Sequence, residues 1–244
     1  MVLTRIFLGS CLFVCVGVAG CQSPVPAVPR IGDAPKLTPG KQQAGASAGQ
    51  AAATSQTAGK QAAGNGVPFD YYLLNLSWSP EFCVTHPDRD QCKQKRAFIV
   101  HGLWPENNDG TYPQHCGERQ GPSTPAEWAD VMPDEGLVKH EWETHGTCTM
   151  YSGDGYFALL RKAYEQVKIP ASVLPQGQET MMTPAAILAA FAKENPAFPE
   201  GSLALSCGNN RLTAIEVCMS KDIQPIACKG IRSCRANVVK ITPQ

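Results

Sequence analysis

The sequence has no excess of charge of either sign. Basic and acidic residues each number 21 among the 244 residues, so the formal net charge is zero. Proteins that bind nucleic acids through their overall charge carry a broad basic surface, and this composition excludes one. Recognition of a polyanion must therefore come from a local site. Internal repeats are also absent, and a hydrophobic fraction of 43% is enough for the core of one globular domain.

Closely spaced cysteine pairs are missing as well. None of the cysteines after residue 66 forms a C-x-x-C pair, which argues against a zinc ribbon or a thioredoxin-like redox site. These cysteines form an even set of eight: Cys83, Cys92, Cys116, Cys148, Cys207, Cys218, Cys228 and Cys234. In an exported protein such a set predicts four disulfides, each of which stabilises the domain by about 2–4 kcal/mol.

The apolar run at the start of the chain is too short to span a membrane comfortably. It follows Arg5, as in a secretory signal. It ends in Val-Ala-Gly-Cys21, which resembles the bacterial lipobox, where the cysteine is lipidated and becomes the new N-terminus. An ordinary signal peptide with a chance cysteine is the alternative. We expect a lipoprotein-type signal over residues 1–21, lipidation of Cys21 and a periplasmic or cell-envelope location. A Cys21→Ala protein that stays in the membrane fraction would contradict the lipid anchor, and without the anchor the protein would be secreted.

Residues 22–66 contain almost no aromatic or large aliphatic side chains. They consist mostly of Pro, Ala, Gly, Gln, Ser and Thr, and such a segment buries too little apolar surface to offset its ordering entropy. We expect a flexible linker here. A partner-binding tail is the alternative, but no motif supports it. The folded domain is then residues 67–244.

Short apolar runs at both ends of this domain enclose a helical middle. Strands are predicted over residues 69–78 and 97–104, and again in the runs LALSC, LTAIEVCMS and ANVVKI near the end of the chain. Helices are predicted over residues 136–146, 156–167 and 185–194, the last with Thr183 as its N-cap. Grouped helices between strands indicate an α+β domain rather than a doubly wound parallel sheet.

Three of the five histidines lie in two short segments. His101 lies towards the end of the predicted strand 97–104, whereas His140 and His145 lie in the string HEWETH. This string is one residue longer than the zinc-protease motif H-E-x-x-H. Five helical steps rotate by about 500°, so the two imidazoles point about 140° apart and cannot share a metal ion from one helix. A metalloprotease is therefore excluded.

The spacing of these residues favours proton transfer instead. Glu141 and His145 are four residues apart, so on a helix the carboxylate would lie beside the imidazole and raise its basicity. His101 would supply a second imidazole on the other side of a substrate. RNA carries its own nucleophile, the 2'-hydroxyl, and needs only a base and an acid, each worth about 10² to 10⁴-fold in rate. No metal or cofactor is required, and His140 is a candidate for a third cation.

Two motifs carry a family resemblance. FIVHGLWP (98–105) and KHEWETHGTC (139–148) resemble the two active-site segments of the ribonuclease T2 family, the Rh/T2/S acid ribonucleases, and LNLSWSPEFC fits the same family. The resemblance covers the domain from about Phe69 onward and is weak between the second motif and Cys207. It implies a central antiparallel β-sheet flanked by helices. It also implies a monomeric endoribonuclease that cleaves single-stranded RNA through a 2',3'-cyclic phosphate to 3'-phosphate ends.

The resemblance also assigns roles to residues. His145 would be the general base and His101 the general acid, with the roles exchanged when the cyclic phosphate is hydrolysed. His140 and Glu141 would hold and polarise the phosphate. Base binding would fall to Trp104 and Tyr112 by stacking and to Glu106 by reading the base edge. The implied disulfides are Cys83–Cys92, Cys116–Cys148, Cys207–Cys234 and Cys218–Cys228.

One position departs from the family pattern. Thr144 stands where the family usually has Lys, and loss of one such contact costs about 10² to 10³ in rate. The enzyme is then slow, or Lys139 or Arg96 compensates. Two other function classes stay open: a catalytically weakened RNA-binding or interaction protein, and a cell-envelope lipoprotein that binds sugars or nucleotides.

Several other polar residues have no matched role in the motifs. His86 and His115 lie in turn-rich stretches, and we expect them at the surface. A basic group near the end of the chain is expected to be a solvated edge, with an RNA track as the alternative. It comprises Lys229, Arg232, Arg235 and Lys240.

Overall fold

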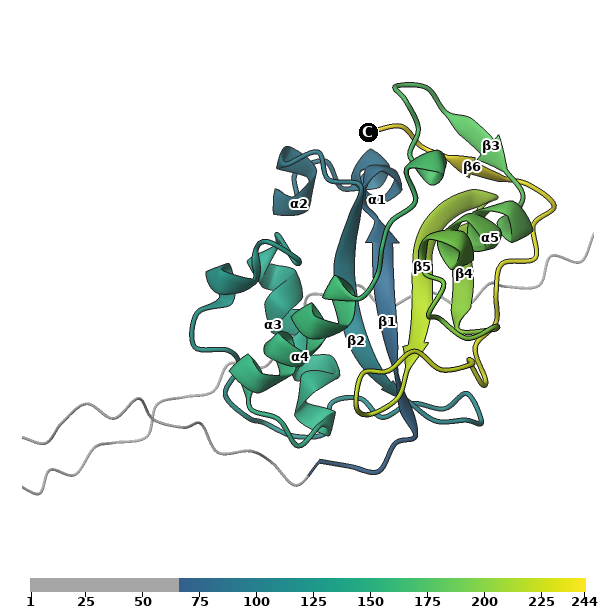
Figure 1. Cartoon of the computed structure of the whole chain (residues 1–244). Helices are drawn as coiled ribbons and strands as arrows, with labels where there is room; N and C mark the ends of the chain where they lie inside the picture. Colours follow the sequence, from purple (N-terminus) through teal and green to yellow (C-terminus); the bar gives the residue numbers. More distant parts are fainter. Residues whose placement is uncertain (1–65) are drawn as a thin grey trace, which may run out of the picture. The chain divides into compact units, whose positions relative to one another are not determined.

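The computed structural model describes residues 66–244 (Figure 1). The predicted signal peptide, the lipidation of Cys21 and the linker up to residue 65 lie outside the described residues and stay predictions. Within residues 66–244, no helix is both long enough and apolar enough to cross a membrane.

Within residues 66–244, six strands form one sheet. They are β1 (Tyr71–Trp78), β2 (Phe98–Glu106), β3 (Thr180–Met182), β4 (Leu203–Gly208), β5 (Arg211–Met219) and β6 (Val239–Ile241). The order is β2-β1-β5-β6-β3, and β4 also pairs with β5. Every pairing is antiparallel except a single parallel bridge between β5 and β6. The expected α+β fold with a central antiparallel sheet is confirmed.

The helices lie mainly between β2 and β4 in the chain. They are α1 (Ser79–Thr85), α2 (Asp90–Lys93), α3 (Glu135–Thr144), α4 (Gly153–Glu165) and α5 (Pro184–Glu194), with 3-10 turns at Pro125–Trp128, Gly146–Cys148 and Ala171–Val173. Thr183 caps α5 as predicted, since its side chain accepts a hydrogen bond from Ala186 N. The short elements α1, α2 and β3 were not predicted. Pro80 lies in the first turn of α1, a position that suits proline.

One face of β1 forms the core. Tyr72, Leu74, Leu76 and Trp78 alternate along the strand and are buried in one apolar cluster with side chains of α4 and α5. Figure 1 shows these two helices against the sheet. The other face of β1 carries Tyr71, Leu73, Asn75 and Ser77, and it is therefore the face available for a site.

The pairing of β1 with β2 contains one irregularity. Asn75 lies opposite Gly102, whereas the next residue, Leu76, lies opposite Val100. His101 is thus an extra residue in β2, a β-bulge. The bulge changes the phase of the alternation, so that Phe98 and Val100 before it and Leu103 after it all reach the same core.

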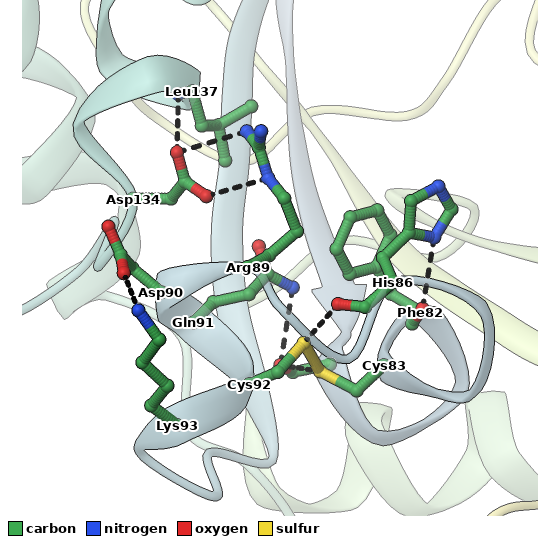
Figure 2. Close-up of polar contacts among 11 residues, drawn as sticks. Phe82, Cys83, His86, Arg89, Asp90, Gln91, Cys92, Lys93, Asp134 and Leu137 are labelled. Atoms are coloured by element: carbon green, nitrogen blue, oxygen red, sulfur yellow. Dashed lines mark hydrogen bonds and ion pairs between the residues drawn. A yellow bond between two sulfur atoms is a disulfide. The ribbon is translucent and has the colours of Figure 1, made fainter.

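The start of α3 is fixed to the α1–α2 region (Figure 2). The carboxylate of Asp134 accepts a hydrogen bond from Leu137 N at 3.1 Å and so caps the helix. It also pairs with Arg89, whose Nε lies 2.9 Å from Oδ2. The Cys83–Cys92 disulfide joins α1 to α2. These contacts set the position of the helix that carries His140 and Glu141.

In the part of the chain that the structure describes, four disulfides connect the same pairs that the resemblance implies. Besides Cys83–Cys92, they are Cys116–Cys148, Cys207–Cys234 and Cys218–Cys228. Cys116–Cys148 ties the loop after β2 to the turn after α3. The last two bridges are nested and hold the segment between β5 and β6 against the sheet.

Candidate active site

The bulge in β2 places three residues of the first motif on the outer face of the sheet. Gly102 and Trp104 lie opposite Asn75 and Leu73 of β1, away from the core. His101 is the extra residue, and 38% of its side chain is exposed. In a regular strand, side chains two residues apart lie on the same face. Without the bulge, residue 101 would therefore point into the core together with Leu103. The bulge therefore takes the His101 imidazole out of the core.

Glu141 is the centre of the contacts between β2 and α3. Its side chain is 1% exposed, and its Oε2 accepts a hydrogen bond of 2.8 Å from Trp104 Nε1. Its Oε1 lies 3.4 Å from His101 Nε2. Burial raises the pKa of Glu141 to about 8, although the Trp104 hydrogen bond opposes this rise. At neutral pH the carboxyl group therefore holds its proton and can donate a hydrogen bond.

This arrangement corrects one expectation from the sequence. Glu141 was expected to pair with His145, but the imidazole beside its carboxyl group is that of His101. The helix ends at Thr144, and His145 is its C-cap with φ −116° and ψ −43°. The i, i+4 geometry of a continuous helix therefore does not extend to the His145 side chain.

His145 is a buried, neutral imidazole. It is 9% exposed, and within residues 66–244 its buried Nδ1 has no hydrogen-bond partner. Burial, followed by the charges of His140, His101 and His115, lowers the pKa of His145 to about 4. The expectation that a carboxylate would raise the basicity of His145 is therefore wrong. The ring lies 5.4 Å from the Trp104 ring, and the His101 ring lies 5.6 Å from Trp104 on an edge contact.

Gly102 is a site residue that the sequence reasoning missed. A Cβ atom at this position would overlap both Glu141 Oε2 and Trp104 Nε1, the two atoms of the hydrogen bond. Glycine is therefore what lets the helix and the strand approach each other here. A lone glycine inside a predicted strand is a known sign of a bulge or of close approach, and that signal was present in the first motif.

His140 and Thr144 lie on the last turns of α3. Thr144 Oγ1 lies 3.5 Å from His140 Nδ1, and Thr144 is buried. The two cations considered as substitutes for the missing lysine are engaged elsewhere. Lys139 lies 3.8 Å from Glu143, and the Arg96 guanidinium donates to the backbone oxygens of Asp130 and Ala129.

His115 was expected to be a surface residue, and it is exposed. Its backbone has a left-handed φ of 51°, and its N–H donates to Thr144 O at 2.8 Å. It lies close enough to the site for its charge to lower the pKa of His145. It also lines a cavity of about 740 Å³ at the end of α3 with Arg119 and Glu143. The turn-forming residues around His115 predict an exposed loop but do not indicate that this loop lies near His145.

No hydrogen bond or ring contact joins any two of the three residues predicted to bind a base, within residues 66–244. Glu106 ends β2 and is buried, and burial, followed by the charge of Glu216, raises its pKa to about 7. Tyr112 lies in the loop after β2 and is 53% exposed. No ring contact or hydrogen bond joins Tyr112 to Trp104 in the part of the chain that the structure describes. Base stacking by this pair stays a prediction.

A groove opens beside His101 and Trp104 on the outer face of the sheet. Its volume is about 420 Å³, within the range of small-ligand sites, and its walls include Ser77 of β1, Phe82 of α1 and Thr213 of β5. The imidazole of His101 thus faces open space rather than the protein interior. Paired imidazoles near a groove can transfer protons to and from a bound ester.

Comparisons with known proteins agree with this geometry. A sequence model of the ribonuclease T2 family matches residues 69–228. A ribonuclease of Aeromonas hydrophila is 46% identical over 101 residues, which cover 41% of this chain and 46% of the relative. A probable ribonuclease of Haemophilus influenzae is 34% identical over 131 residues, which cover 46% of this chain and 48% of the relative. The chain thus spans about half the length of these two curated relatives.

The fold is similar to that of solved ribonucleases. Trichomaglin, described as an S-like ribonuclease, has a TM-score of 0.58 and 22% identity, over 72% of this chain and 98% of the other. At that identity the similarity concerns the fold.

Proposed function

Because this chain belongs to the ribonuclease T2 family, we propose that it is an endoribonuclease that cleaves single-stranded RNA by histidine acid and base catalysis. The observation that carries the proposal is the pair of imidazoles, His101 and His145, whose rings lie 5.6 Å and 5.4 Å from the ring of Trp104, the residue that donates to Glu141. A groove lined by His101 and Trp104 offers room for the substrate. The proposed partner is single-stranded RNA.

In the first step, neutral His145 takes the proton of the 2'-hydroxyl. The 2'-oxygen bonds to phosphorus, and the bond between phosphorus and the 5'-oxygen breaks. Protonated His101 gives its proton to that leaving oxygen. In the second step the roles are exchanged: neutral His101 takes a proton from water, the water oxygen bonds to phosphorus, and protonated His145 gives its proton to the departing 2'-oxygen. The products are a 2',3'-cyclic phosphate and then a 3'-phosphate.

Glu141 would act as a neutral acid in this scheme. With its pKa raised to about 8 by burial and its side chain 1% exposed, it would hold its proton beside His101, whose Nε2 lies 3.4 Å from Oε1. The phosphate would then meet His101 rather than this buried carboxyl group. His140, exposed on the same helix, would supply a cation. Thr144 offers a hydroxyl where the family usually has a lysine, so we expect a modest rate.

The function is tested by product analysis. The oxidised protein, incubated with single-stranded RNA in EDTA, should yield 2',3'-cyclic phosphate ends that convert to 3'-phosphates, measured by mass spectrometry. Cleavage that requires an added metal ion, or 5'-phosphate ends, would refute the mechanism. RNA binding without cleavage at acidic and neutral pH would favour the weakened RNA-binding protein.

The proposed roles predict an acidic optimum. His145 must be neutral, so kcat/KM should rise as the pH increases through about 4. His101 must be protonated, and burial lowers the pKa of His101 below its usual 6.5, so kcat/KM should fall as the pH rises towards that value. The profile should therefore be bell-shaped with its maximum between these limits.

A variant shows whether the two limbs of the pH profile come from His145 and His101 or from the stability of the folded protein in acid. The charge of His140 lowers the pKa of both His101 and His145, so His140→Gln should move both limbs of the profile to higher pH, at reduced activity. An optimum above pH 7, or limbs that do not move in the variant, would contradict the assignment.

A further inference from the structure

The segment between β5 and β6 contains a short stretch held at both ends by disulfides. We call residues 228–234 the C-terminal strap. Cys228 joins it to Cys218 of β5, and Cys234 joins it to Cys207 of β4. The family match ends at residue 228, so nearly all of the strap lies beyond it. Because β2 and β5 are both antiparallel to β1, the loops that follow them leave the same end of the sheet (Figure 1).

The strap covers the outer face of the sheet beside Trp104. The hydroxyl of Tyr71 donates a hydrogen bond to Lys229 O. Ile231 packs against a small apolar cluster of Tyr71, Leu73 and Cys218, and Trp104 packs against the same cluster. The strap and the indole therefore share one apolar support, separate from the main core.

The strap also contacts the loop that leads to Tyr112. Gly230 and Gly110 both have left-handed φ values, 75° and 84°. A Cβ atom on Gly230 would lie 2.8 Å from Gly110 N and 2.9 Å from Gly110 Cα, so the two backbones meet at a distance that only glycine permits. The loop is also held by Asn108 N, which donates to Asp70 Oδ2 at 2.8 Å, and by Gly110 N, which donates to Asn107 O at 3.0 Å.

We propose that the C-terminal strap is a positioning element for RNA binding: through the Gly230–Gly110 contact it holds the loop that presents Tyr112 at the Trp104 end of the site. The strap thereby sets the affinity for RNA and the preference among bases, without touching the reacting atoms. The proposal rests on the proposed function, because it assigns Tyr112 to the substrate.

The test compares three glycine variants in the full-length, oxidised protein. Gly230→Ala introduces both backbone strain and the steric overlap. Gly177→Ala introduces the same strain, since its φ is 80°, but its Cβ would meet no atom within 4 Å. Gly230→Asn relieves part of the strain, because asparagine tolerates a left-handed φ, and keeps the overlap. We measure kcat and KM on a set of dinucleoside phosphates.

The expected result separates positioning from stability. Both Gly230 variants should raise KM about tenfold, the size of effect that loss of one stacking side chain produces. They should also alter the preference among bases and leave kcat within about threefold of wild type. Gly177→Ala should resemble wild type. Unchanged KM and preference in Gly230→Ala, or a fall in kcat that tracks the melting temperature, would overturn the proposal.

A binding measurement keeps this test independent of catalysis. If the wild-type protein does not cleave RNA, the same variants are titrated with adenosine 5'-monophosphate, followed by tryptophan fluorescence. Weaker binding in the Gly230 variants alone would support the strap although the proposed function had failed. Equal binding by all variants, or no binding by wild type, would overturn the strap proposal.

Discussion

Replacing either His101 or His145 with alanine is expected to lower kcat/KM for RNA by about 10² to 10⁴-fold, the contribution of one proton transfer. Both imidazoles lie near the Trp104 ring but come from different elements, so neither can take over the position of the other. Initial rates on single-stranded RNA at the acidic optimum measure the effect. Because both residues act in the same step, the double variant should lose less than the product of the two single losses.

His86→Ala is the matched control for these variants. His86 is an exposed imidazole at the end of α1, stacked on Phe82 with ring centroids 4.3 Å apart (Figure 2). Its removal should leave kcat/KM within about twofold of wild type. Retention of more than a tenth of the activity by His145→Ala, in a protein that unfolds at the wild-type temperature, would remove His145 from the role of general base.

The second large effect is expected at Gly102. In Gly102→Ala the new methyl group would occupy the space of the Trp104–Glu141 hydrogen bond, so strand β2 and helix α3 must move apart. A displacement of about 1 Å at a catalytic group costs about 10²-fold in rate. Loss of a buried hydrogen bond also lowers the free energy of unfolding by about 1–3 kcal/mol. Activity assays and urea unfolding measure the two effects separately.

Two variants show whether the loss at Gly102 comes from the hydrogen bond. Trp104→Phe keeps an aromatic ring but lacks the indole N–H, so it should reproduce part of the rate loss without the steric overlap. Gly208→Ala places a methyl group in β4, where its nearest contact would be Thr213 Cγ2 at 3.6 Å, and should leave the free energy of unfolding nearly unchanged. Wild-type activity in a folded Gly102→Ala protein would show that the position of Glu141 is unimportant.

The sequence predicted the parts of the site that local patterns encode. The strand containing His101 follows from a short apolar run, and the helix containing His140 and Glu141 follows from a stretch that ends at Gly146. The resemblance of the two motifs to one family joined them in a single hypothesis. The apolar run over residues 69–78 likewise predicted a strand, and β1 is buried along nearly its whole length. These features depend on residues that are close together in the sequence, and one amino-acid sequence is therefore enough to predict them.

Contacts between elements could not be predicted in the same way. The choice of His101 rather than His145 as the neighbour of Glu141 depends on where α3 ends and how closely β2 approaches it. The low pKa of His145 arises from tertiary burial and from the charges of other histidines, one of them on a separate loop. The strap contact between Gly110 and Gly230 joins positions 120 residues apart in the numbering, and no local spacing encodes it.

The extra residue in β2 makes this strand sensitive to its length. A substitution at Ile99 or Val100 changes the packing of one side chain. A deletion at either position would let the strand pair with β1 without a bulge, and residue 101 would then face Leu76 inside the core. A one-residue deletion would thus remove the imidazole from the groove and bury it among apolar side chains, so β2 should tolerate a change of residue far better than the loss of one.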